Sequence, residues 1–75
     1  MTSSESLGRR IAYLRKQRKM SQLDLSIEAN VNKNYISDLE KGRRNPTLLV
    51  IERIADALGV SLEVLFKGVE SIPGL

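Results

Sequence analysis

Apolar residues near the start of the chain recur at helical spacing. Leu7, Ile11 and Leu14 stand at positions i, i+4 and i+7. This spacing predicts an amphipathic helix over roughly residues 6–18, with one apolar face turned towards a core.

A second, shorter helix is predicted from Ser21 to about Ala29. Ser21 is a favourable N-cap, and Asp24 three residues later approximates a capping box and favours the positive end of the helix dipole. Asn30 tolerates the left-handed backbone conformation that closes a helix. We therefore expect the chain to turn at Asn30.

A third helix follows almost at once. Asn32 is a good N-cap, the expected helix runs from Lys33 to about Lys41, and Gly42 ends it. Only two residues separate Asn30 from Lys33, so the second and third helices must cross at a large angle.

Two further helices complete the pattern. After a basic loop, Thr47 caps an apolar helix over residues 48–58, and Ser61 caps a last short helix through Phe66. No stretch alternates with the period of a strand, so the sequence predicts an all-α fold, a compact bundle of five short helices. The fourth helix is expected at the centre of the core, with an inward row of Leu48, Ile51, Ile54, Ala55 and Leu58.

Length and composition narrow the class of protein. A chain of 75 residues supports one core, so we expect a single domain over residues 1–75, with its core at about 6–67 and a tail at 68–75. Without Cys or His, the chain offers no zinc site, disulfide, thiol nucleophile or neutral-pH proton shuttle, so we expect no enzyme activity, cofactor or metal. No apolar run approaches the roughly 20 residues of a membrane span, and the polar start lacks the layout of a signal peptide, so the expected location is the cytoplasm.

Charge is unevenly distributed along the chain. The net charge is +3, but residues 1–20 carry +5, residues 21–40 carry −3 and residues 41–60 carry +2. Two basic segments therefore flank an acidic one. Such a distribution is typical either of ordinary solvated helix faces or of two surfaces that contact phosphate.

The middle of the chain carries a specific arrangement of apolar, small and polar positions. It reads Gln22-x-x-Leu25-Ser26-x-x-x-Asn30-Val31-x-x-x-x-Ile36-x-x-Leu39-Glu40-x-Gly42, and it resembles the helix-turn-helix of the Cro/repressor-type (XRE) family of transcriptional regulators. Ser26 replaces the usual Ala and Asn30 the usual Gly, which keeps the small size and the backbone freedom that the corner requires. The resemblance implies a fold of the lambda-repressor-like type, in which the second and third helices form the helix-turn-helix.

A second resemblance lies in the third helix and the loop after it. The segment Asn34-Tyr-Ile-Ser37, followed by Glu40-Lys-Gly-Arg-Arg-Asn45, is similar to the controller proteins of restriction–modification systems. This implies control of restriction–modification genes.

The resemblance implies that the third helix enters the major groove of DNA with its N-terminal residues against base edges. Lys33, Asn34 and Ser37, with Asp38 at the edge, share one outward face and are the expected base readers. Lys33 can donate to guanine and Asn34 can make two hydrogen bonds to adenine. The alternative is the ordinary polar face of a surface helix.

Backbone contacts are expected on both sides of the reading face. Gln22 lies at the first turn of the second helix, where it can meet a phosphate or serve only as a good helix starter. Tyr35 can reach phosphate or simply pack on the turn. The full set of expected backbone contacts is Gln22, Asn32, Tyr35, Arg43, Arg44 and Asn45.

Other charged residues are expected to serve the fold or the solvent. Glu40 would be repelled by DNA, so we expect it to form an ion pair with an arginine. The candidate partner is Arg10 on the first helix. Solvated positions are expected for Arg15, Arg18, Lys19 and Arg53.

A homodimer is the expected assembly, because one short helix contacts too few base pairs to select a site. The family usually pairs through its final helix. The expected interface residues are Val64, Phe66, Val69 and Ile72, whereas Leu62 and Leu65 are assigned to the core of one protomer.

Leu23 and Ile27 form an apolar pair on the side of the second helix that the pattern leaves exposed. Family members that activate transcription commonly present acidic residues there, so RNA polymerase is a candidate partner without the usual acidic contact. We expect the N-terminal arm to cover part of the pair; the alternative is a small patch for a partner.

Together these features predict a sequence-specific, DNA-binding transcriptional regulator that acts as a homodimer on a palindromic operator. Double-stranded DNA and a second copy of the chain are the expected partners. The alternative is a protein-interaction module, such as an antitoxin, that uses the same helical frame to bind a protein.

Overall fold

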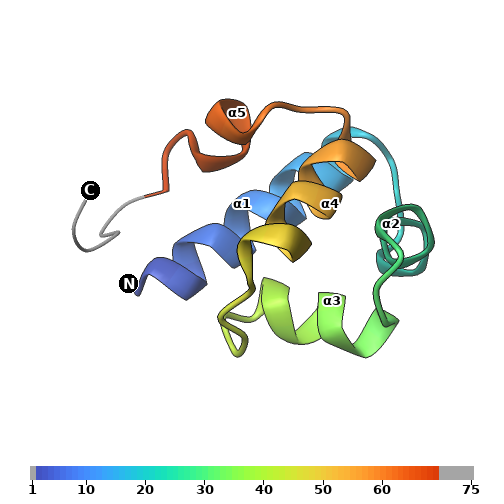
Figure 1. The fold of residues 1–75 in the computed structure, drawn as a ribbon, viewed down its shortest axis with the longest axis horizontal. Coiled ribbons are helices and arrows are strands. Elements are labelled where there is room, and N and C mark those ends of the chain that lie inside the picture. Colours follow the sequence, from blue (N-terminus) through green and yellow to red (C-terminus); the bar gives the residue numbers. More distant parts are fainter. Residues whose placement is uncertain (1, 70–75) are drawn as a thin grey trace.

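The computed structural model describes residues 2–69 of the chain. This part contains five helices joined by short loops, and no strand (Figure 1). The all-α fold predicted from the sequence is confirmed. The bounds are α1 Ser3–Gln17, α2 Gln22–Ala29, α3 Lys33–Glu40, α4 Leu48–Leu58 and α5 Leu62–Phe66.

Each helix begins at a polar side chain that accepts a hydrogen bond from the first turn. The caps of the last four helices are those expected, namely Ser21, Asn32, Thr47 and Ser61. The predicted start of α1 at residue 6 is wrong, because Thr2 and Glu5 form a reciprocal capping box that starts the helix at Ser3. The Thr2 hydroxyl accepts from the Glu5 amide at 3.1 Å, and the Thr2 amide donates to the Glu5 carboxylate at 2.9 Å.

The predicted left-handed turn between α2 and α3 is confirmed. Asn30 adopts the left-handed conformation, with φ of 56° and ψ of 48°. Ser26 is buried beside the corner, and its hydroxyl donates to the Leu23 carbonyl at 2.7 Å, so a polar residue is accommodated without an unpaired hydroxyl.

A continuous apolar core joins all five helices. Its fully buried members include Leu25 and Ile36 of the helix-turn-helix, Ile54 of α4 and Leu65 of α5. The core role predicted for Leu65 is therefore confirmed.

Two leucines assigned to the core are in fact exposed. Leu48 is 64% exposed, because it occupies the first position of α4, where the helix emerges from the preceding loop. Leu62 is 37% exposed, because the short α5 has a single inward side and Leu65 occupies it.

The backbones of α1 and α3 approach each other at Gly8. A Cβ atom there would collide with the carbonyl oxygen of Leu39 and lie 2.9 Å from that of Glu40. Glycine at this position therefore lets α1 lie directly against the C-terminal end of α3. The sequence pattern did not single out Gly8.

No helix in the described part of the chain is long and apolar enough to cross a membrane.

Candidate nucleic-acid interface

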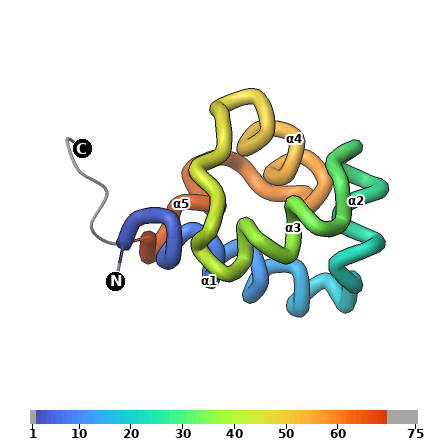
Figure 2. Tube along the Cα trace, turned by 90° about the horizontal axis from the view of Figure 1, so that it is seen from below, coloured from blue at the N-terminus to red at the C-terminus, as the bar shows by residue number. Residues whose placement is uncertain are grey.

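Helix α3 and the loop after it form one side of the molecule. Figure 1 places them at the lower edge, and Figure 2, viewed from that side, shows them crossing the centre of the view with α2 beside them. Ile36 and Leu39 are fully buried, which fixes the opposite face of α3 as the one that points outwards.

The four expected base readers lie on α3 as the sequence predicts, but they differ in exposure. Lys33 and Asn34 are exposed at the start of the helix, whereas Ser37 and Asp38 are half-buried further along. Lys33 and Asn34 are therefore the residues of this set that are most accessible to a ligand.

Asn32, expected to contact the DNA backbone, also caps α3. Its side-chain oxygen accepts a hydrogen bond from the Asn34 backbone amide at 2.7 Å. No acidic residue stands in the first turn of α3, so the positive end of the helix dipole is not compensated there. This end of the helix, together with Lys33, is suited to approach a polyanion.

The other end of α3 carries a group of two arginines, one carboxylate and one aromatic ring. Asp38 lies 4.0 Å from the guanidinium of Arg43 and 3.6 Å from that of Arg44. Arg44 also lies over the ring of Tyr35, 5.2 Å from its centroid. Tyr35 is half-buried and packs on the core, so its ring both packs and supports Arg44. Asn45 is exposed in the loop that follows.

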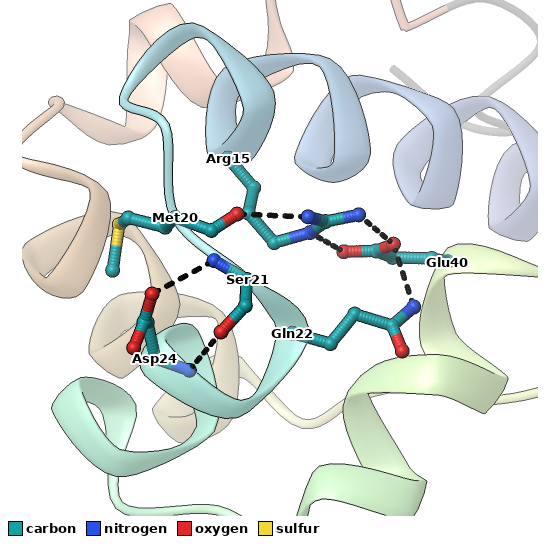
Figure 3. A network of polar contacts seen from close by, with 6 residues as sticks. All are labelled: Arg15, Met20, Ser21, Gln22, Asp24 and Glu40. Carbon is teal, nitrogen blue, oxygen red and sulfur yellow. Dashed lines mark hydrogen bonds and ion pairs between the residues drawn. The ribbon is translucent and has the colours of Figure 1, made fainter.

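Glu40 pairs with Arg15, so the expected pair with Arg10 is wrong (Figure 3). The two side chains form a bidentate contact, with Nε donating to Oε2 at 2.7 Å and Nη2 to Oε1 at 3.0 Å. Arg15 also donates to the Met20 carbonyl at 2.9 Å. The hydrogen bond to Glu40 raises the pKa of Arg15 above its ordinary value, although burial opposes the shift.

Gln22 belongs to the same network. Its side-chain nitrogen donates to Glu40 at 3.0 Å, so the residue expected to meet phosphate is held in place by α3 (Figure 3). A side-chain amide has two N–H donors, and the second remains for another acceptor.

The solvated position expected for Arg15 is wrong, because Arg15 is buried. Arg18 is exposed as expected, and its guanidinium also donates to the carbonyl of Leu58 at the end of α4, at 2.7 Å. One sequence signal for Arg15 was available: it continues the row of Leu7 and Ile11 at i+4 and i+8, on the face that points inwards. The guanidinium takes this place because a carboxylate faces it.

Arg10 fixes α5 to α1. Its guanidinium donates twice to the Val64 carbonyl, at 2.9 and 3.2 Å, and lies 5.5 Å from the ring centroid of Tyr13. Val64 is 39% exposed, while Phe66 and Val69, also expected at the dimer interface, are half-buried and pack on the core. Ile72 lies outside the described residues.

The apolar pair on α2 is largely exposed. Leu23 is 52% and Ile27 is 69% exposed, and partial cover by the N-terminal arm stays a prediction. Residues 3–17 form α1, and this helix packs against α3 and α5.

Other proteins share the sequence pattern of this helix-turn-helix. A family model described as Helix-turn-helix matches residues 11–65. The chain is 38% identical over 60 residues to the immunity repressor protein of Bacillus phage phi105, and the match covers 80% of this chain but only 42% of that protein. It is 43% identical over 54 residues to the control protein C.BamHI of Bacillus amyloliquefaciens, covering 71% of this chain and 67% of that protein.

A solved structure extends the likeness to three dimensions. The restriction–modification controller protein C.Esp1396I, crystallised as a tetramer with its natural 35 base-pair operator, superposes with a TM-score of 0.83 at 31% identity. The superposition covers 89% of this chain and 88% of that one.

Proposed function

The chain belongs to the helix-turn-helix family, and on that premise we propose that it is a sequence-specific DNA-binding transcriptional regulator. Helix α3 enters the major groove, where Lys33 and Asn34 read base edges, Ser37 assists them and Asp38 lies at the edge of the reading face. The proposed backbone contacts are Gln22, Asn32, Tyr35, Arg43, Arg44 and Asn45.

One observation carries this proposal. Helix α3 and the loop after it lie on the same side of the molecule (Figure 2). The helix carries exposed polar residues at its start, the loop carries exposed arginines, and Ile36 and Leu39 fix the opposite face of the helix in the core. A surface of this kind supplies base-edge contacts at one end and phosphate contacts at the other, as specific recognition of duplex DNA requires.

The protein acts as a homodimer on a palindromic operator. In this proposal α5 contributes Val64 and Phe66 to the interface, the segment after it contributes Val69 and Ile72, and the exposed Leu62 extends it. A two-fold dimer places its two reading helices about 34 Å apart, one turn of DNA.

Control of restriction–modification genes is the role that the controller relatives favour. The protein works without a catalytic step, cofactor or metal, in the cytoplasm. A contact with RNA polymerase through α2 would use the apolar Leu23 and Ile27 rather than acidic side chains.

Selection of bound fragments from a random duplex pool tests the function. We expect recovery of palindromic sequences with half-sites about one helical turn apart. Binding to them should weaken steeply as salt rises, because each neutralised phosphate releases counterions. No enrichment, or binding of a protein partner that salt does not affect, would favour a protein-interaction module instead.

Substitution of Asn34 tests the assignment of the readers. Asn34→Ala should lower affinity for the selected sequence by about tenfold, the equivalent of one good base contact, and leave binding to random DNA nearly unchanged. Gln17→Ala, which removes a neutral amide at an exposed position on α1, is the control and should leave binding to both duplexes unchanged. Equal losses of Asn34→Ala on selected and random duplexes would refute its role as a reader.

A further inference from the structure

Asp38 is an unexpected residue on a surface that meets DNA. It lies on the outward side of α3, whereas the other carboxylate of this helix, Glu40, is bound to Arg15 with only 7% of its side chain exposed. A carboxylate close to phosphates costs binding energy through like-charge repulsion. Its presence therefore needs a compensating role.

The structure shows what Asp38 contacts. One carboxylate oxygen is 3.6 Å from Nε of Arg44 and the other is 4.0 Å from a terminal nitrogen of Arg43. The carbonyl of Asp38 also accepts a hydrogen bond from the Arg43 amide at 2.9 Å. Backbone and side chain of one residue thus hold the start of the basic loop.

Arg44 is restrained on two sides. Asp38 approaches its Nε edge, and its central guanidinium carbon lies over the ring of Tyr35. A guanidinium has five N–H donors in a planar fork, so its terminal nitrogens are left for a phosphate. Half of the Arg44 side chain, 52%, is exposed to solvent.

We propose that Asp38 is a positioning residue: it restrains Arg43 and Arg44 so that both meet phosphates only when α3 lies in the correct register on its operator. The proposal rests on the DNA-binding function above and assigns Asp38 a role other than base reading. Unrestrained arginines would find phosphates in any register, because phosphate contacts carry no sequence information. Asp38 therefore raises specificity by lowering affinity for random DNA.

Asp38→Asn tests this role, since it removes the charge and keeps the shape. Affinity for the selected operator and for a random duplex is measured by fluorescence anisotropy. Random DNA should gain more affinity than the operator, and the specificity ratio should fall about threefold, as expected for loss of a surface ion pair. Asp38→Glu, which keeps the carboxylate, should restore most of the ratio.

Glu52→Gln is the matched control, because it removes one negative charge at an exposed position on α4. It should leave the specificity ratio unchanged. If Asp38→Asn tightens binding to operator and random DNA equally, as a pure charge effect does, the positioning role is overturned.

Repeating Asp38→Asn in a protein that already carries Arg43→Ala and Arg44→Ala separates positioning from base reading. Positioning requires that the change in specificity disappear in this background. A change in preference at a single base pair that persists there identifies Asp38 as a base reader and overturns the proposal. A wild-type protein with no sequence preference instead refutes the DNA-binding function itself.

Discussion

The molecule contains two groups of arginine and carboxylate that share the same chemistry and differ in burial. Arg15 and Glu40 join α1 to α3 at 2.7 Å, with 11% and 7% of their side chains exposed. Asp38, Arg43 and Arg44 meet at 3.6 to 4.0 Å, with 34%, 68% and 52% exposed. The members of the first pair are 25 residues apart along the chain and lie on different helices.

Burial decides what each group can do. A buried charge without a partner lowers the stability of the folded state. The Arg15–Glu40 contact therefore stabilises the fold, and neither side chain is available to a ligand. Ion pairs near the surface contribute little to stability and exchange partners at low cost. The arginines beside Asp38 can therefore exchange this carboxylate for a phosphate when one is correctly placed.

Breaking the buried Arg15–Glu40 pair should have the largest effect on stability. Arg15→Ala leaves the Glu40 carboxylate without its guanidinium and should lower the free energy of unfolding by about 3 kcal/mol. Urea unfolding followed by circular dichroism measures it. Arg9→Ala, an exposed position on the same helix, is the control and should change stability by less than about 0.5 kcal/mol. Similar values for the two variants would contradict the contrast.

The exposed group should respond in the opposite way. Arg44→Ala should leave the free energy of unfolding within about 0.5 kcal/mol of wild type. It should weaken binding to the selected operator more than to random DNA, and reduce the slope of log operator affinity against log salt by about 1. Anisotropy titrations at several salt concentrations check this. A loss of stability comparable with that of Arg15→Ala would remove the distinction between the two groups.

A smaller effect concerns Asp24, an exposed carboxylate that serves only a helix terminus. The backbone amide of Ser21 donates to it at 2.9 Å, and this hydrogen bond, with the Ser21 side chain, lowers the pKa of Asp24 below its ordinary 3.8. Since the folded state favours the ionised form, the stabilisation is complete above pH 3.8 and is lost as the pH falls through the lower, folded-state pKa.

Asp24→Asn keeps a neutral acceptor at every pH and so removes this dependence. The difference in melting temperature between wild type and the variant should shrink as the pH is lowered from about 6 to about 2. Thermal unfolding at a series of pH values measures it. A difference that stays constant with pH would show that ionisation of Asp24 does not stabilise α2.

The sequence predicted the parts of the site that depend on neighbouring residues. It placed Lys33 and Asn34 at the start of a capped helix, and the left-handed Asn30 before it, because caps and turns are formed within three or four residues. Apolar spacing also indicated the inward face of α3, which the burial of Ile36 confirms.

The contacts between helices could not be predicted from the sequence. Helical spacing places Arg15 on the inward row of α1, but it does not show that Glu40 is its partner or that Arg10 binds the Val64 carbonyl. The close approach at Gly8 and the exposure of Leu48 likewise depend on where another helix lies.

The sequence by itself thus determined which segments are helical, where the last four of them start and which residues α3 presents at its first turn. Tertiary structure alone decided which arginine is committed to the fold and which remain available to a ligand. The physical reason is that capping energies are local, whereas the strength of a charge pair depends on how much water the packing of distant helices leaves around it.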